Sequence, residues 1–119
     1  MADSPIQIFG LQNDQATRAA LRFFKERRVA ISFVDLRRRP IATGELRRFV
    51  EKLGAAALAD TEGRAWRAAG LAYLRMTDEE LAAKLLADAR LLKLPLVRNG
   101  QEFTAGPAEP TWKRWLAAL

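Results

Sequence analysis

The stretch that decides the fold is Ile6–Phe24, "IQIFGLQNDQATRAALRFF". Apolar residues alternate with Gln7 until Gly10 interrupts the pattern, which predicts a short strand. Asn13 and Asp14 are residue types that cap helices, and a helical pattern of apolar residues follows them. The segment therefore predicts a strand that leads through a polar turn into a helix N-terminus. Such a turn is a common way to build a site for an anion or a reactive thiol.

The chain contains no cysteine and no histidine in 119 residues. This composition excludes a disulfide, a thiol nucleophile, a histidine general base and a zinc site of the usual nitrogen and sulfur type. The acidic residues do not have the spacing of a calcium loop. We therefore expect no metal and no cofactor, and the polar turn must serve a purpose other than thiol chemistry.

Length and composition predict one globular domain spanning residues 1–119, with 50% hydrophobic and 29% charged residues. No apolar run approaches the roughly 18 residues of a membrane span, and the N-terminus does not resemble a signal peptide. We expect a cytoplasmic protein with no membrane contact. The net charge of +6 has two interpretations, a nucleic-acid footprint or a solvated basic surface. We favour the solvated surface.

The rest of the chain alternates strand and helix patterns. Residues 31–35 predict a second strand, and Thr43 is expected to cap a helix that Gly54 ends. Residues 55–92 have a wholly helical or turn-like pattern. Within them, Thr77–Glu80 has the sequence of a capping box, in which side chain and backbone satisfy each other's hydrogen bonds.

The C-terminal part predicts a hairpin and a helix. Asn99 and Gly100 both tolerate positive φ, so they are expected to form a tight primed turn between strands around 96–97 and 102–103. The last helix is expected to place four apolar residues on one face: Trp112, Trp115, Leu116 and Leu119. The predicted order is β-α-β-α, a helical insertion at about 55–92, then β-β-α.

This order, with Pro95 at the head of the third strand, resembles the thioredoxin-like arrangement. Four stretches resemble the ArsC family, which includes arsenate reductases and Spx-type transcription regulators: Phe9–Ala16, "TEGRAWR" at 61–67, "KLPLV" at 93–97 and "AGPAEPTWKRWL" at 105–116. The resemblance covers the chain from about Ile6 onward. It implies an α/β thioredoxin-like fold with a four-stranded mixed sheet, and a cis bond that places Leu94 beside the Asp14 turn.

The departures from the family pattern concern its chemistry. Asp14 occupies the position of the family's cysteine, and three positions that often hold arginine are Glu62, Leu94 and Pro107. In arsenate reductases the cysteine attacks the oxyanion and the arginines neutralise it. The resemblance therefore implies a member that lacks both the nucleophile and the cations around it.

Two groups of residues are candidates for a remaining site. Asp14 is either a carboxylate that imitates a thiolate or a plain helix cap, and we favour the cap. Arg64 and Arg67 flank Trp66, where they either form a residual anion pocket facing Asn13 or pack their stems on the indole; we favour the second. The complete set of candidates is Gln12, Asn13, Asp14, Arg64, Arg67 and Pro95.

Three functions follow from these patterns. The first is a catalytically inactive ArsC/Spx-like protein that works as a monomer by binding a protein, which the resemblance implies is RNA polymerase or another cytoplasmic protein. The second is an arsenate reductase-like or other enzyme acting on an anionic substrate through Asp14, although no second acid is evidently near it. The third is nucleic-acid binding through the basic face. We favour the first.

Overall fold

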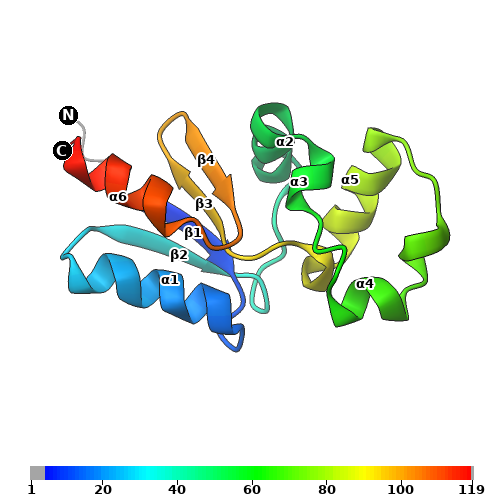
Figure 1. Ribbon diagram of the computed structural model, residues 1–119, viewed down its shortest axis with the longest axis horizontal. Helices are drawn as coiled ribbons and strands as arrows, with labels where there is room; N and C mark the ends of the chain where they lie inside the picture. The colour runs from blue at the N-terminus through cyan, green and yellow to red at the C-terminus, as the bar shows by residue number, and fades with distance from the viewer. Residues whose placement is uncertain (1–4, 119) are drawn as a thin grey trace.

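The computed structural model describes residues 5–118, which are built around a four-stranded sheet (Figure 1). Its strands are β1 (Ile6–Gly10), β2 (Ile31–Asp35), β3 (Leu96–Asn99) and β4 (Glu102–Ala105). The spatial order is β2-β1-β3-β4. Strand β1 runs parallel to β2 and antiparallel to β3, and β3 runs antiparallel to β4. The sheet is therefore mixed, and the predicted α/β thioredoxin-like fold is confirmed.

Helices cover both faces of the sheet. Helices α1 (Gln15–Glu26) and α6 (Glu109–Ala117) lie on one face, and α2 (Thr43–Leu53) lies on the other (Figure 1). Alternate residues of β1 point to opposite faces, because side chains alternate along a strand. Ile8 therefore packs in the cluster of α1 and α6, whereas Phe9 meets Phe49 of α2 with ring centroids 5.8 Å apart.

The cluster under α1 and α6 is aromatic. The rings of Phe24 and Trp112 lie 5.3 Å apart, and both side chains are buried. The indole Nε1 of Trp112 donates a hydrogen bond of 2.9 Å to the hydroxyl of Thr104, so this polar group is satisfied inside the core. Burial of side chains of this size stabilises the fold by roughly 1.5–3 kcal/mol each.

The segment between α2 and β3 contains short helices that lie beyond one end of the sheet (Figure 1). They are α3 (Ala55–Leu58), α4 (Arg64–Ala68), η1 (Leu71–Tyr73), α5 (Asp78–Ala87) and η2 (Ala89–Leu91). The Asp60 N–H donates to the Leu91 carbonyl at 2.9 Å, which ties the two ends of the segment together. The predicted capping box is confirmed, because Thr77 and Glu80 exchange side chain-to-backbone hydrogen bonds.

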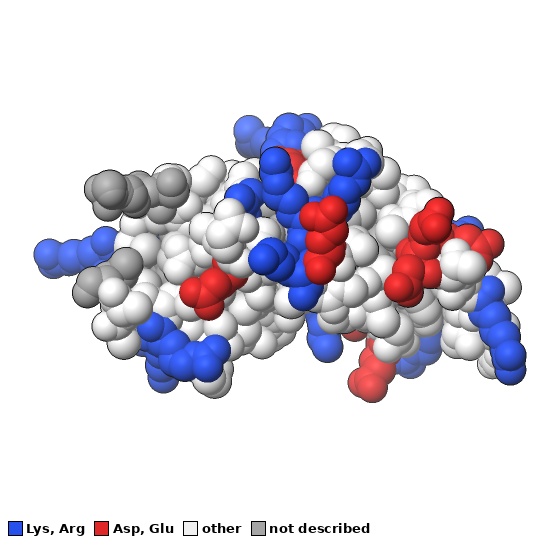
Figure 2. Space-filling view, turned by 90° about the horizontal axis from the view of Figure 1, so that it is seen from above, with Lys and Arg blue, Asp and Glu red and all other residues white. Residues whose placement is uncertain are grey.

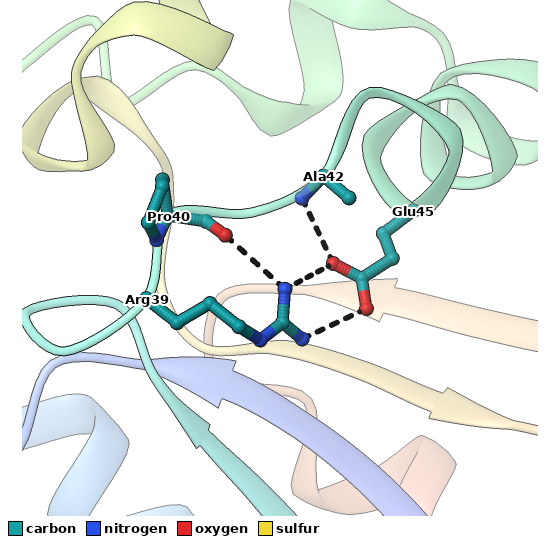
Figure 3. A network of polar contacts seen from close by, with 4 residues as sticks. All are labelled: Arg39, Pro40, Ala42 and Glu45. Carbon is teal, nitrogen blue, oxygen red and sulfur yellow. Dashed lines mark hydrogen bonds and ion pairs between the residues drawn. The ribbon is translucent and has the colours of Figure 1, made fainter.

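The start of α2 differs from the prediction by one residue. Thr43 is the first residue of the helix and Ala42 occupies the N-cap, although alanine offers no side-chain acceptor. Glu45 supplies the other half of a capping box: its carboxylate accepts from the Ala42 N–H at 2.8 Å and from both terminal nitrogens of Arg39 at 3.0 Å (Figure 3). The guanidinium of Arg39 also lowers the pKa of Glu45 below its usual value.

The β3–β4 hairpin forms, but its turn lies one residue later than predicted. Asn99 pairs with Glu102, so Gly100 and Gln101 are the two central residues. Gly100 alone has a positive φ, 61°, which is the pattern of a II′ turn. Asn99 therefore closes the strand pair and does not need the left-handed conformation.

The last helix buries the indoles of Trp112 and Trp115 as predicted. Leu116 is half-buried, and Leu119, which was expected on the same face, lies outside the described residues. None of the helices in residues 5–118 has the length and apolar character required to cross a membrane.

Candidate functional site

The turn between β1 and α1 is held by the side chain of Asp14. This residue is the N-cap of α1, with an extended backbone (φ −90°, ψ 128°). Its Oδ2 atom accepts two hydrogen bonds of 2.8 Å, one from the Thr17 N–H and one from the Thr17 hydroxyl. The preferred interpretation of Asp14 as a helix cap is therefore confirmed, and Asn13 is not the cap.

Thr17 joins the cap to the end of β1. Its side chain is completely buried, and its Oγ1 atom also accepts from the Leu11 N–H at 3.4 Å. The Asp14 N–H in turn donates to the Leu11 carbonyl at 2.9 Å. Gly10 has to be small, since a Cβ there would lie 3.0 Å from the Cβ of Thr17 and closer still to its hydroxyl. The turn is thus fixed by short local contacts.

An open hollow of about 450 Å³ lies beside this turn. Its lining comes from the β1–α1 turn, the ends of the helical segment, and the residue before Pro95: Leu11, Asn13, Asp14, Ala16, Asp60, Arg90, Leu92, Lys93, Leu94 and Pro107. The peptide bond between Leu94 and Pro95 is cis, as the family resemblance implied. The structure therefore brings Leu94 to the same hollow as the Asp14 turn.

Two cations line the hollow, and neither was a candidate from the sequence. Arg90 is held by Asp88 through two hydrogen bonds, of 3.1 Å from Nε and 2.9 Å from a terminal nitrogen. These bonds lower the pKa of the Asp88 carboxyl and raise that of the guanidinium. Lys93 forms no ion pair within 4.0 Å among residues 5–118, and its stem lies where a Cβ on Gly106 would contact it.

The candidate arginines lie elsewhere. Of the residues that the structure describes, those lining the hollow do not include Arg64, Arg67 or Gln12, and all three are exposed. A terminal nitrogen of Arg67 donates to the backbone carbonyl of Glu62. The anion pocket that Arg64 and Arg67 were considered for, facing Asn13, does not form.

Of the three positions at which this chain lacks the family's arginine, two lie at the hollow and one does not. Leu94 and Pro107 line the hollow, whereas Glu62 does not. Within residues 5–118, no three acidic side chains gather into a group that could hold a metal ion. Asp60 does reach the hollow, so a second carboxylate shares this space with Asp14, which the sequence did not suggest.

The chemistry open to this site follows from its charges. The Asp14 carboxylate can accept a proton or attract a cation, but it cannot exchange thiols or be oxidised as sulfur can. An oxyanion approaching α1 would meet a negative charge where the helix N-terminus would otherwise attract it. Lys93 is the lining cation whose charge no carboxylate among the described residues neutralises.

Solved structures with the same fold include a YFFB protein, with a TM-score of 0.85 at 18% identity, covering 92% of this chain and 96% of that one. An ArsC family related protein from Bacteroides fragilis gives a TM-score of 0.83 at 18% identity, covering 95% and 98%. An arsenate reductase from Vibrio cholerae gives 0.79 at 17% identity, covering 94% and 98%. Identities this low establish the shared fold alone.

No curated protein matches the chain. The model of the ArsC family, in contrast, matches residues 9–114, which run from the end of β1 through the capped turn to Arg114 in the last helix. This match covers nearly the whole sequence. The chain belongs to the ArsC family.

Proposed function

We propose that this chain is a member of the ArsC family that has given up thiol chemistry and acts by binding another protein. One observation carries the proposal: Asp14 occupies the N-cap of α1, where it accepts from the N–H and hydroxyl of Thr17, in a chain without cysteine. The carboxylate occupies the place at which a helix N-terminus would activate a thiol. By family resemblance, RNA polymerase or another cytoplasmic protein is the partner to test first.

The charges of the hollow support the same proposal. Two unit charges 4 Å apart interact by about 4 kcal/mol at the effective dielectric constant of a protein surface. An oxyanion beside α1 would therefore be repelled strongly by Asp14, and Arg90 is already engaged by Asp88. Lys93 is opposed by two carboxylates that line the hollow, Asp14 and Asp60, so the hollow has no excess positive charge to hold an oxyanion. The site does not favour an anionic substrate.

The first experiment measures arsenate reduction by the purified protein with glutathione as reductant, with a heat-killed sample as its control. We expect no activity above that control. Any activity that exceeds it and scales with protein concentration would overturn the proposal. Binding to purified RNA polymerase, measured by interferometry, tests the partner; absence of binding would remove that partner while leaving the lack of thiol chemistry intact.

A second experiment tests whether Asp14 stands in a thiol-activating position. The substitution Asp14→Cys would place a thiol where the Thr17 N–H donates to the capping atom. A thiolate there should titrate below the ordinary value of about 8.5. Ala19→Cys, on the exposed middle of α1, is the matched control. Equal pKa values for the two thiols, from the pH dependence of alkylation, would refute the premise.

The presence of Asp60 on the hollow favours one alternative, an enzyme that uses a pair of carboxylates. Such an enzyme would have to bind an anionic substrate although Asp14 repels it, and Lys93 would supply the attracting positive charge. Inorganic phosphate and arsenate serve as probes in a thermal-shift titration. Saturable stabilisation that Lys93→Gln abolishes would support this alternative over the binding protein, and no stabilisation would remove it.

A further inference from the structure

An apolar groove of about 390 Å³ lies between α2 and α5, away from the Asp14 hollow. Helix α2 contributes Leu46 and Val50 to it, and α5 contributes Ala82, Ala83 and Leu86. Leu46 and Val50 are four residues apart, and Leu86 lies three and four residues after the adjacent Ala83 and Ala82, so each helix presents one stripe to the groove. Two helices whose apolar stripes converge on an open groove resemble half of a helix bundle, in which further helices would cover the stripes.

The apolar surface continues across α5. Ala83 also lines a neighbouring hollow together with Leu74, Met76 and Ala87. Next to them, 92% of Tyr73 and 52% of Leu74 are exposed, and no other large hydrophobic side chain of residues 5–118 is exposed in this way. The charged residues Arg75, Glu80 and Lys84 share this second hollow. Apolar patches bordered by polar residues indicate interaction sites, whereas isolated exposed apolar residues need no explanation.

The groove carries opposite charges on its two walls. Arg47 lies on the α2 side, and Asp78 and Glu79 lie on the α5 side. None of the three belongs to an ion pair within the part of the chain that the structure describes. Seen from above, basic side chains gather over the region of α2, and acidic side chains lie between them and beside them toward the helical segment (Figure 2).

We propose that this groove is the interface of a twofold-symmetric dimer, in which α2 and α5 of one copy pack against α5 and α2 of the other. A twofold axis that runs along the groove places each wall opposite the other wall of the second copy. Arg47 then faces Asp78 and Glu79 across the interface, twice. A partner of one charge sign would be repelled by one of the walls, so the surface is complementary to itself.

The proposed dimer differs from the monomer expected from the sequence. Sequence patterns show α2 and α5 as separate amphipathic segments, but only the fold places their stripes on one groove. The groove shares no lining residue with the hollow at Asp14, so the dimer does not rest on the proposed function.

Sedimentation equilibrium between about 1 μM and about 1 mM protein measures the dissociation constant of the dimer. We expect dimerisation within this range, and an Ala83→Arg variant should weaken it by about tenfold or more because the side chain would fill the groove. Ala83 is exposed, so the folded monomer should tolerate the change. Ala19→Arg, on the exposed face of α1, is the matched control and should leave the dissociation constant unchanged.

Charge reversal tests the proposed pairing. Arg47→Glu and Glu79→Arg should each weaken the dimer by about tenfold, because each places like charges opposite one another. The double variant should restore most of the affinity, since the pair is then reversed and complementary again. Circular dichroism of each variant confirms that the monomer is folded.

A protein that stays monomeric up to about 1 mM would overturn the proposal and leave the groove for a helix of another protein. A dimer that is insensitive to Ala83→Arg and to both charge reversals would also overturn it, since the interface would then lie elsewhere.

Discussion

Removal of the Asp14 carboxylate should destabilise the protein by about 2–3 kcal/mol. Replacement of an N-cap by alanine costs roughly 0.5–2 kcal/mol in most helices. Here the same oxygen also accepts from the hydroxyl of Thr17, whose side chain is fully buried and cannot turn to water. An unsatisfied buried donor costs about 1–3 kcal/mol. The Asp14→Ala cost should therefore exceed that of an ordinary cap.

Urea unfolding followed by tryptophan fluorescence measures this cost, and the matching drop in melting temperature should be roughly 8–12 °C for a domain of this size. Thr77→Ala is the internal control, because Thr77 caps α5 at an exposed position and accepts only from the Glu80 N–H, at 3.1 Å. That variant should lose about 1 kcal/mol.

A double-mutant cycle isolates the contact between the two side chains. The Thr17→Val change removes the donor hydroxyl, so Asp14→Ala should cost less in that background, with a coupling of about 1 kcal/mol. The reasoning would be refuted by an Asp14→Ala cost no larger than that of Thr77→Ala. It would be refuted equally by additive effects of the two changes at the β1–α1 turn.

Three further changes have defined outcomes. Gly10→Ala should destabilise the fold by about 1–3 kcal/mol, because its new Cβ would overlap the side chain of Thr17; thermal unfolding with an unchanged melting temperature would contradict this. Trp112→Phe should cost about 2–3 kcal/mol, since it removes buried volume and leaves the Thr104 hydroxyl without its 2.9 Å donor; urea midpoints would show this, and a loss below about 0.5 kcal/mol would argue against the buried bond. The Glu45 pKa is lowered in the folded state, so the ionised carboxylate stabilises the fold fully above its unfolded pKa of about 4.3, and this stabilisation is lost as pH falls through the folded pKa. The difference in unfolding free energy between the wild type and Glu45→Gln should therefore shrink from about pH 5 to about pH 3. A difference that grows over this range would contradict the prediction.

The features that could be predicted from the sequence are those fixed by hydrogen bonds between residues close together in the chain. The Asp14 cap and the Thr77–Glu80 capping box each depend on residues within four positions, and both formed. The β3–β4 turn moved by one residue, because Gly100 alone satisfies a II′ turn and the strand pairing could extend to Asn99. Errors of this size arise where two neighbouring residues are both suited to a turn.

The lining of the hollow could not be predicted, because it depends on where the helical segment returns to the sheet. Arg64 and Arg67 were candidates because they flank Trp66 within a family stretch. The hollow instead receives Arg90 from η2, and the two arginines lie outside it. Asp60 arrives there because its N–H is bound to the Leu91 carbonyl. These contacts join residues about thirty positions apart, and no local pattern encodes them.

The capped turn also shows how a chain without cysteine holds the start of α1. A thiolate at this position could accept the Thr17 N–H, whereas here a single carboxylate oxygen, Oδ2, accepts both that N–H and the Thr17 hydroxyl. The sulfur of cysteine is a weak hydrogen-bond acceptor, so Asp14 satisfies the buried hydroxyl better than a cysteine side chain would. Active sites commonly sacrifice stability for reactivity, and a family member released from catalysis can recover that stability. Under the proposed function, the same carboxylate places a negative charge in the path of an oxyanion, so one residue would both stabilise the turn and disfavour arsenate chemistry.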